Sequence, residues 1–241
     1  MTALGYALAA AVANVVGGLL ITSASPRGIR AQRLLLGFGA GFMLAVAFLA
    51  MIPHASGGGT SAGLGILAGY RLVHVTQHVL TPHFHFGEET HHEAMIDRWV
   101  GTAALLGLLL HTFFDGVAIA SAFDVETSLG VVVFMAVFVH KIPEGVTIAS
   151  IMLVSGNSKR RTLFGVALLG LSTIAGVLLT AVLRPLAEHG LAISAGVTIY
   201  VAASNLMPEV QKEKDATSGV AVFLGVLVYV LAQALLHGMD H

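Results

Sequence analysis

Cysteine is absent from the 241-residue sequence, and charged residues are scarce, at 10% of the chain. Without cysteine the protein can form neither disulfides nor metal sites built on thiolates. A bound metal ion would therefore have to be held by His, Asp, Glu, Asn, Ser, Met or backbone oxygen. This absence excludes soft thiolate chemistry as a basis for function.

Hydrophobic residues, by contrast, make up 56% of the chain, and the mean hydropathy is +0.87. Such values lie outside the range of soluble domains and predict an integral membrane protein surrounded by the lipid bilayer. The net charge of -1 favours no partner. The basic stretches 27–33 and 159–161 are interpreted as topology signals near anionic headgroups, with no role in binding nucleic acid. The N-terminus lacks the basic region and cleavage site of a secretory signal, so the first apolar run is expected to be a retained span.

Apolar runs long enough to cross the bilayer, about 18 to 25 residues for roughly 30 Å of hydrocarbon, occur eight times. We predict an all-α, polytopic bundle that forms a single transmembrane domain over residues 1–241. The eight predicted spans are 3–22, 34–52, 61–80, 100–123, 129–154, 162–183, 191–207 and 219–236. The third is the least apolar, because Arg71, His74, Gln77 and His78 lie in its second half.

Lys and Arg in the short loops predict the orientation of this bundle, because such loops stay in the cytoplasm. Basic residues lie between the first and second spans, the fifth and sixth, and the seventh and eighth. Both termini are therefore expected to be extracytoplasmic and segment 81–97 cytoplasmic. We expect the protein to lie in a bacterial-type inner (plasma) membrane, and the sequence leaves a homodimer open.

The fourth and fifth spans contain the same pattern twice. Residues 111–121 read HTFFDGVAIAS, and 29 positions later residues 140–150 read HKIPEGVTIAS. In each copy a histidine and a carboxylate are spaced i, i+4, which places them on one helix face. Ionisable residues inside a membrane span are costly and mark functional sites. Two such faces turned toward each other would bring His111, Asp115, His140 and Glu144 into one pocket.

Two imidazoles and two carboxylates suit Zn²⁺, and also Fe²⁺, Mn²⁺, Co²⁺ or Cd²⁺, whereas a Mg²⁺ or Ca²⁺ site would not need imidazole. Small residues, Gly116 and Gly145, follow the carboxylates and permit close helix approach. Lys141 lies beside His140 and is expected to substitute for a second cation, although a salt bridge that only offsets the cost of buried charge is an equally strong interpretation. A structural hydrogen-bond network is the plainer alternative for the four residues.

A second internal similarity joins the second and seventh spans. Residues 40–54 read AGFMLAVAFLAMIPH, and residues 195–209 read AGVTIYVAASNLMPE. Because these spans run in opposite directions, as do the fourth and fifth, we predict inverted repeats, with spans one to three and six to eight around the central pair.

The two motifs resemble those of the ZIP (Zrt- and Irt-like) family of metal-ion transporters. The family's span-four pattern H-N-x-P-E-G is matched at His111, Asp115 and Gly116, and its span-five pattern [H/Q]-[E/D]-I-P-[H/E] at residues 140 and 142–144. The resemblance implies eight spans, extracytoplasmic termini, and transport of metal toward the cytoplasm by an elevator-like alternating access. Three positions depart from the family pattern. Thr112 and Phe114 replace Asn and Pro, and Lys141 replaces an acidic residue that would bridge two metals, so we expect one bound ion rather than two.

Other polar residues are auxiliary candidates along the metal's path. Segment 81–97 is histidine-rich, and the family resemblance makes it a cytoplasmic loop that could bind metal weakly or serve as a plain linker. The candidates are His74, His78, His83, His85, His91, His92, Ser204, Asn205 and Glu209. Ordinary helix-end or linker roles are the alternative for each of them.

The strongest rival from another class is an intramembrane zinc-dependent hydrolase, with Glu144 as its general base. The sequence has no H-E-x-x-H motif, and two equivalent half-sites suit a carrier better. A metal sensor or a channel is a third hypothesis. We therefore predict a transporter of divalent transition metals, zinc first, and not an enzyme.

Overall fold

The computed structural model describes residues 2–23, 29–55, 59–80, 98–211 and 216–237. Within these ranges the chain forms eight helical rods and no strand. Three of the rods contain a π-helical segment, labelled η. The rods are α1 (Ala3–Ser23), α2–η1–α3 (Ile29–Val46, Ala47–Met51, Ile52–His54), α4–η2 (Gly59–Val75, Thr76–Leu80), α5 (Arg98–Val125), α6 (Thr127–Val154), α7 (Lys159–Val182), α8–η4–α9 (Arg184–Tyr200, Val201–Leu206, Met207–Gln211) and α10 (Ala216–His237).

Each predicted span coincides with one of these rods, which confirms an all-α, polytopic membrane bundle. Seven of the rods in the described ranges are long and apolar enough to cross a membrane. The eighth, α4–η2, is not among them: α4 has 17 residues, and the polar side chains of Arg71 and His74 lie near its end. A helix is present where the third span was predicted, but the count of eight spans is not confirmed.

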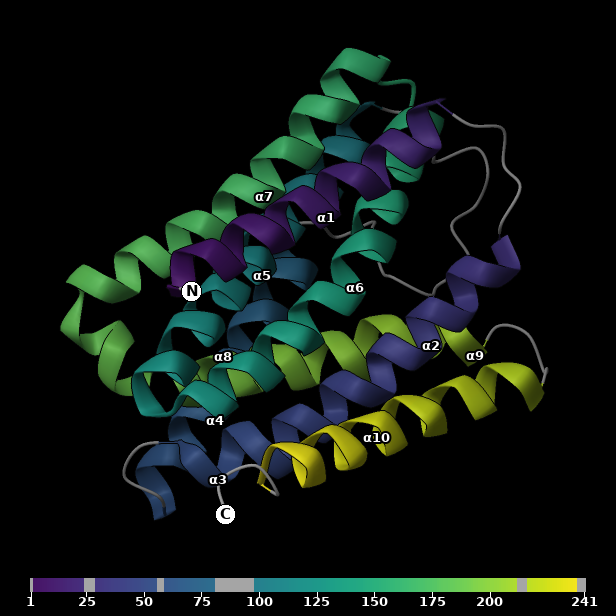
Figure 1. Ribbon diagram of the computed structural model, residues 1–241. Helices are drawn as coiled ribbons and strands as arrows, with labels where there is room; N and C mark the ends of the chain where they lie inside the picture. Colours follow the sequence, from purple (N-terminus) through teal and green to yellow (C-terminus); the bar gives the residue numbers. More distant parts are fainter. Residues whose placement is uncertain (1, 24–28, 56–58, 81–97, 212–215, 238–241) are drawn as a thin grey trace.

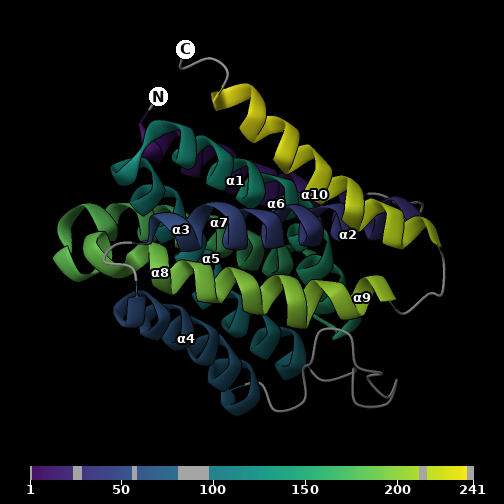
Figure 2. The same ribbon diagram turned by 90° about the horizontal axis from the view of Figure 1, so that it is seen from below.

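The rods lie side by side, with the start of α1 and the end of α10 at the same end of the bundle, on the left in Figure 1. The α5–α6 and α7–α8 junctions lie at that end too. The α6–α7 junction and the start of α10 lie at the opposite end. Figure 2 shows α2–α3 and α8–α9 running between the outer helices α4 and α10. The described part of the chain therefore begins and ends at one end of the bundle, and the side of the membrane on which this end lies stays a prediction.

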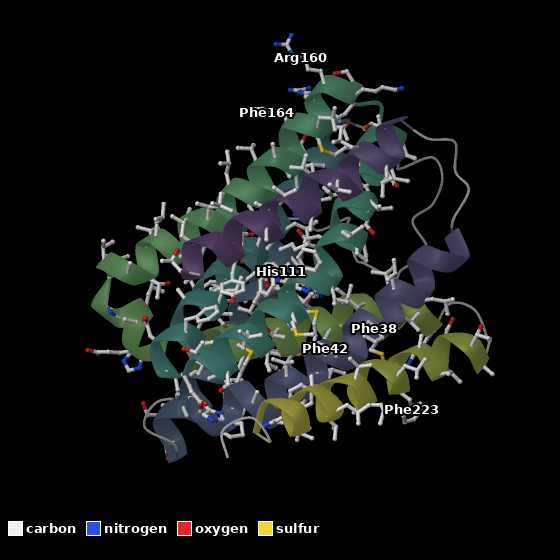
Figure 3. The ribbon with its side chains drawn as sticks, in the orientation of Figure 1. Phe38, Phe42, His111, Arg160, Phe164 and Phe223 are labelled. Carbon is white, nitrogen blue, oxygen red and sulfur yellow. The ribbon has the colours of Figure 1, made fainter. Side chains whose placement is uncertain are left out.

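Large apolar side chains cover much of the outer surface. Phe223 is 77% exposed and Phe164 is 65% exposed, and Figure 3 shows these two side chains pointing outward on different sides of the bundle. A water-soluble protein would bury side chains of this size, whereas hydrocarbon favours them at the surface. The described surface is that of an integral membrane protein.

Glycines place the four central helices in close, reciprocal contact. A Cβ added at Gly17 of α1 would lie 2.2 Å from the carbonyl oxygen of Ile142 in α6, and one added at Gly176 of α7 would lie 2.1 Å from that of Phe113 in α5. In the same way Gly145 of α6 faces the Asn14 carbonyl at 2.1 Å and Gly116 of α5 faces the Thr173 carbonyl at 1.9 Å. The α1–α6 contacts therefore match the α7–α5 contacts. This is the relation expected when a twofold axis in the membrane plane exchanges α1 with α7 and α5 with α6.

The flanking helices follow the same exchange. The four contacts are Gly41 to the Val222 carbonyl, Gly196 to the Ile66 carbonyl, Gly69 to the Ile193 carbonyl and Gly225 to the Phe38 carbonyl. They relate the pair α2 and α10 to the pair α8 and α4. Small residues are required at such crossings because they let two backbones meet without lipid between them. The inverted repeat predicted from sequence is therefore present in the packing.

The second and seventh rods also match in local structure. Each contains a π-helical segment, Ala47–Met51 in one and Val201–Leu206 in the other. Each segment ends two residues before a proline, Pro53 or Pro208. π-Helical turns are rare and concentrate at functional sites. Their occurrence at matching positions supports the relation that the two AG-to-Pro stretches predicted.

Candidate metal site

The central pair α5 and α6 brings all four predicted ligands together. His111, Asp115, His140 and Glu144 each offer a ligand atom, and these atoms lie within 4.8 Å of one another. All four side chains are buried, and Figure 3 shows His111 in the middle of the bundle. In the described part of the chain no other group of three or more His, Asp or Glu residues comes close enough to hold one metal ion.

One oxygen of each carboxylate faces both imidazoles. Asp115 Oδ2 lies 3.4 Å from His111 Nε2 and 3.4 Å from His140 Nε2. Glu144 Oε2 lies 3.5 Å and 3.7 Å from the same two nitrogens. Zinc bonds of about 2.0–2.1 Å imply edges of roughly 3.3 Å between neighbouring ligand atoms of a tetrahedron. These four contacts are thus close to the spacing that a four-coordinate zinc ion needs.

The imidazole of His140 is held in the tautomer that a metal requires. Its Nδ1 lies 2.8 Å from the carbonyl oxygen of Ala136, and because a carbonyl can only accept, Nδ1 donates the proton. The Nε2 atom is then a lone-pair donor directed at the carboxylates, and it makes no hydrogen bond with the described residues. A hydrogen bond to the remote ring nitrogen is the usual support for a metal-binding histidine.

Lys141 places a cation inside the cluster. Its Nζ lies 2.6 Å from Asp115 Oδ2 and 3.0 Å from Glu144 Oε2, and the side chain is fully buried. The ammonium group therefore contacts the same two oxygens that face the imidazoles. With neutral imidazoles the cluster has a net charge of -1, so two carboxylates and one ammonium share a low-dielectric site in which unpaired charge is very costly.

Asn14 of α1 is a site residue that the sequence analysis missed. Its Nδ2 donates a hydrogen bond of 3.1 Å to Glu144 Oε1, and the side chain is 0% exposed. An amide inside the first span was a usable signal, because polar side chains in apolar spans carry a functional expectation. The twofold pattern drew attention to α5 and α6, whereas Asn14 approaches the cluster only through the packing of α1 on α6.

A small pocket adjoins the cluster between α2, α5, α6 and α8. Met43, Met51 and Thr198 line it together with Asp115 and His140. Neither methionine was predicted as a site residue, since methionine in an apolar span usually serves packing. Both are about 1% exposed, and they form part of the wall of the pocket that Asp115 and His140 also line.

The auxiliary candidates that the structure describes lie outside the four-residue cluster. The rings of His74 and His78 lie with their centroids 4.0 Å apart and are tilted by 33°, and His74 also contacts the edge of Tyr200 at a centroid distance of 5.9 Å. Asn205 is buried and Ser204 half-buried in η4. The side chain of Glu209 and all of His83, His85, His91 and His92 fall outside the described residues. A path role for any of these residues therefore stays a prediction.

Comparison with known proteins places the chain in a family. The model of the ZIP Zinc transporter family matches residues 88–233, more than half of the chain. Similar proteins include the human zinc transporter SLC39A7, at 29% identity over 55% of this chain, the zinc transporter foi of Drosophila melanogaster, at 27% over 52%, and the zinc transporter ZIP9 of Micropogonias undulatus, at 28% over 61%.

The matched stretches cover 30%, 20% and 51% of those three relatives' own lengths, so the chain spans about half or less of each. The family match contains α5 and α6 with the duplicated motif, and all four clustered residues lie within it. The chain belongs to the ZIP zinc transporter family.

Proposed function

We propose that this protein transports divalent transition-metal ions across the membrane, with zinc as its main substrate. The observation that carries the proposal is the buried group of two imidazoles and two carboxylates on an antiparallel helix pair inside the bundle. Ionisable groups in that position cost free energy unless a substrate or an internal partner compensates them. The curated relatives named above are zinc transporters, and enzymatic activity is not proposed.

The metal would enter the cluster as the dehydrated ion, held by Nε2 of His111 and His140, Oδ2 of Asp115 and Oε2 of Glu144. Four ligands of this type suit zinc, and Fe²⁺, Mn²⁺, Co²⁺ and Cd²⁺ are further candidate substrates. Carboxylate and imidazole replace the water that the ion sheds. The fold's inverted repeats are the kind of architecture that exposes one central site to either side in turn.

Lys141 would offset the negative charge of the two carboxylates when no metal is bound. In that state its ammonium group contacts both carboxylates, at 2.6 and 3.0 Å. An arriving divalent ion would compete for those same two oxygens and change the net charge of the cluster from -1 to +1. We propose that only one ion binds at a time, and that Lys141 holds the position of a second ion and pairs with the carboxylates during the empty return step.

The proposed direction is toward the cytoplasm, with both termini outside, in a bacterial-type inner membrane. Exposed Lys159, Arg160 and Arg161 at the start of α7 are consistent with a cytoplasmic end there. On this proposal segment 81–97 would also be cytoplasmic, where its histidines would meet the departing metal. A homodimer stays an expectation for the assembly.

Zinc uptake into proteoliposomes tests the proposal. Wild-type protein is expected to take up zinc, whereas Asp115→Ala and Glu144→Ala should not. Competition by the other divalent metals then ranks the substrates. Tight zinc binding without flux, together with cleavage of an amide or ester substrate, would contradict the carrier and favour the intramembrane hydrolase.

A further inference from the structure

The two carboxylate oxygens of Glu144 have different partners, because Asn14 binds only one of them. Oε1 accepts the hydrogen bond from Asn14 Nδ2 at 3.1 Å. The contacts of Glu144 with Lys141, His111 and His140 all use the other oxygen, Oε2. Since a carboxylate can only accept when ionised, the amide nitrogen must face it, and the amide oxygen then points toward Gly145.

We propose that Asn14 is a positioning residue that restricts Glu144 to a single ligand oxygen and thereby favours four-coordinate ions such as zinc. The inference rests on the proposed function, because it takes the cluster to be the metal site. It assigns to α1 a part in metal selectivity, which neither the duplicated motif nor the family match at residues 88–233 contains.

The chemistry follows from the ways in which carboxylates bind metals. A free carboxylate can bind through one oxygen or both, and larger ions such as Cd²⁺ accept more ligand atoms than the four that zinc prefers. While Oε1 is tied to Asn14, Glu144 contributes Oε2 alone, and one atom from each of the four residues gives four ligand atoms. Releasing Oε1 would add a fifth ligand atom and raise the affinity of the site for ions with higher coordination numbers.

The placement of Asn14 depends on the close crossing of α1 and α6. A Cβ at Gly145 would lie 2.1 Å from the carbonyl oxygen of Asn14 and 2.7 Å from its side-chain oxygen. Only glycine at that position lets the amide come alongside Glu144, which is the preceding residue of α6. The amide is therefore held by backbone packing and not by a flexible loop.

The inverted repeat supplies a matched control position. Thr173 of α7 faces Gly116 as Asn14 faces Gly145, and both side chains are 0% exposed. The hydroxyl of Thr173 lies 3.4 Å from the carbonyl oxygen of Leu169 in its own helix. Twofold-related positions thus hold one polar group that binds a cluster carboxylate and one that bonds within its own helix.

The test compares Asn14→Leu with Thr173→Val, each of which keeps the side-chain shape and removes the polar group. Purified full-length protein is titrated with Co²⁺, whose visible absorption is strong in four-coordinate and weak in higher-coordinate sites. For Asn14→Leu we expect the cobalt absorption to fall several-fold and the preference for zinc over cadmium to fall by about 10-fold, since losing the partner of a metal ligand typically changes metal affinity by about 10–100-fold. Thr173→Val should match wild type in both measurements.

Each result has a separate meaning. If wild-type protein binds cobalt but Asn14→Leu gives the same spectrum and the same zinc-to-cadmium ratio, Asn14 does not position Glu144. If wild-type protein binds neither cobalt nor zinc, the proposed function fails, and the inference fails with it. Asn14→Ala provides a second variant should Asn14→Leu not fold, and its spectrum is expected to shift in the same direction.

Discussion

The α5 and α6 halves of the cluster share one sequence pattern but differ in the residues next to their ligands. Each half contributes a histidine and a carboxylate four residues later. At the position after the histidine, however, α5 has Thr112, whose hydroxyl donates to the carbonyl of Leu109 in its own helix at 3.0 Å. α6 has Lys141 there, whose ammonium group crosses to Asp115.

A second difference lies behind the carboxylates. Glu144 has Asn14 of α1 as a hydrogen-bond donor, whereas the related position near Asp115 holds Thr173, which bonds within its own helix. The twofold scaffold therefore sets where the four ligands lie, and the departures from it set the charge and orientation of the ligands. Substitutions at twofold-related positions separate these two contributions.

The largest expected effect is the loss of Lys141. Lys141→Ala would leave two buried carboxylates without their cation, and breaking a buried ion pair in this way costs about 3–5 kcal/mol of unfolding free energy. Chemical denaturation in detergent measures it, and added zinc should restore much of the loss. Thr112→Ala, its twofold mate, should cost only about 1 kcal/mol, since one weak intrahelical hydrogen bond is removed. Equal losses in the two variants would show that the ion pairs of Lys141 contribute no more to stability than a single hydrogen bond.

The next effect concerns the carboxylates, at which the two halves should respond alike. Asp115→Asn and Glu144→Gln each remove an ionic ligand while keeping the side chain's shape. We expect zinc uptake to fall by at least about 100-fold in both, beyond the 10–100-fold typical of an outer-shell partner. Initial rates in proteoliposomes measure this. A variant that retained near wild-type uptake would remove that carboxylate from the ligand set.

A smaller effect tests the scaffold itself. Gly116→Ala and Gly145→Ala would each drive a Cβ against a backbone carbonyl, at 1.9 and 2.1 Å, so two helices must separate. We expect each to cost about 1–3 kcal/mol of stability, with similar values because the crossings are related by the inverted repeat. Thermal unfolding in detergent compares them. Gly63→Ala, at a glycine with no atom within 4 Å of an added Cβ, is the control and should be near neutral.

The smallest expected effect is a change in the number of bound ions. Lys141→Asp replaces the internal cation by an acidic residue, and we expect the number of zinc ions bound per chain to rise from one to two. Equilibrium dialysis with metal analysis provides the number. An unchanged stoichiometry would contradict the role of Lys141 as the substitute for a second ion, and the ion pair would then serve only to offset buried charge.

Much of the fold was predictable because lipid imposes a simple rule on sequence. A spanning helix must satisfy its own backbone hydrogen bonds and be apolar for about 20 residues, so the predicted ends of most rods agree with the observed ends to within a few residues. The third rod is harder to predict. Its polar residues, including Gln77 and His78, are compatible with a helix but not with an apolar span, and local composition does not decide between them.

The four clustered residues were predictable because the motif occurs twice and because i, i+4 spacing fixes a common helix face. The polarity of Asn14 could have marked it as a candidate, but its contact with Glu144 was not predictable, since nothing in the local sequence says which helix α1 packs against. The same holds for Met43 and Met51, which line the pocket beside Asp115 and His140. Their positions depend on contacts between residues far apart in the chain.

The sequence by itself determined the membrane environment, the absence of thiolate ligands and the types of side chain available for a metal, because these follow from composition and from spacing within one helix. Tertiary structure decided which oxygens and nitrogens face one another. The Lys141 ammonium lies between Asp115 and Glu144, and Asn14 holds the outer oxygen of Glu144. These contacts arise from glycine-mediated crossings of separate helices, and a crossing depends on the shapes of two surfaces, which neither segment specifies alone.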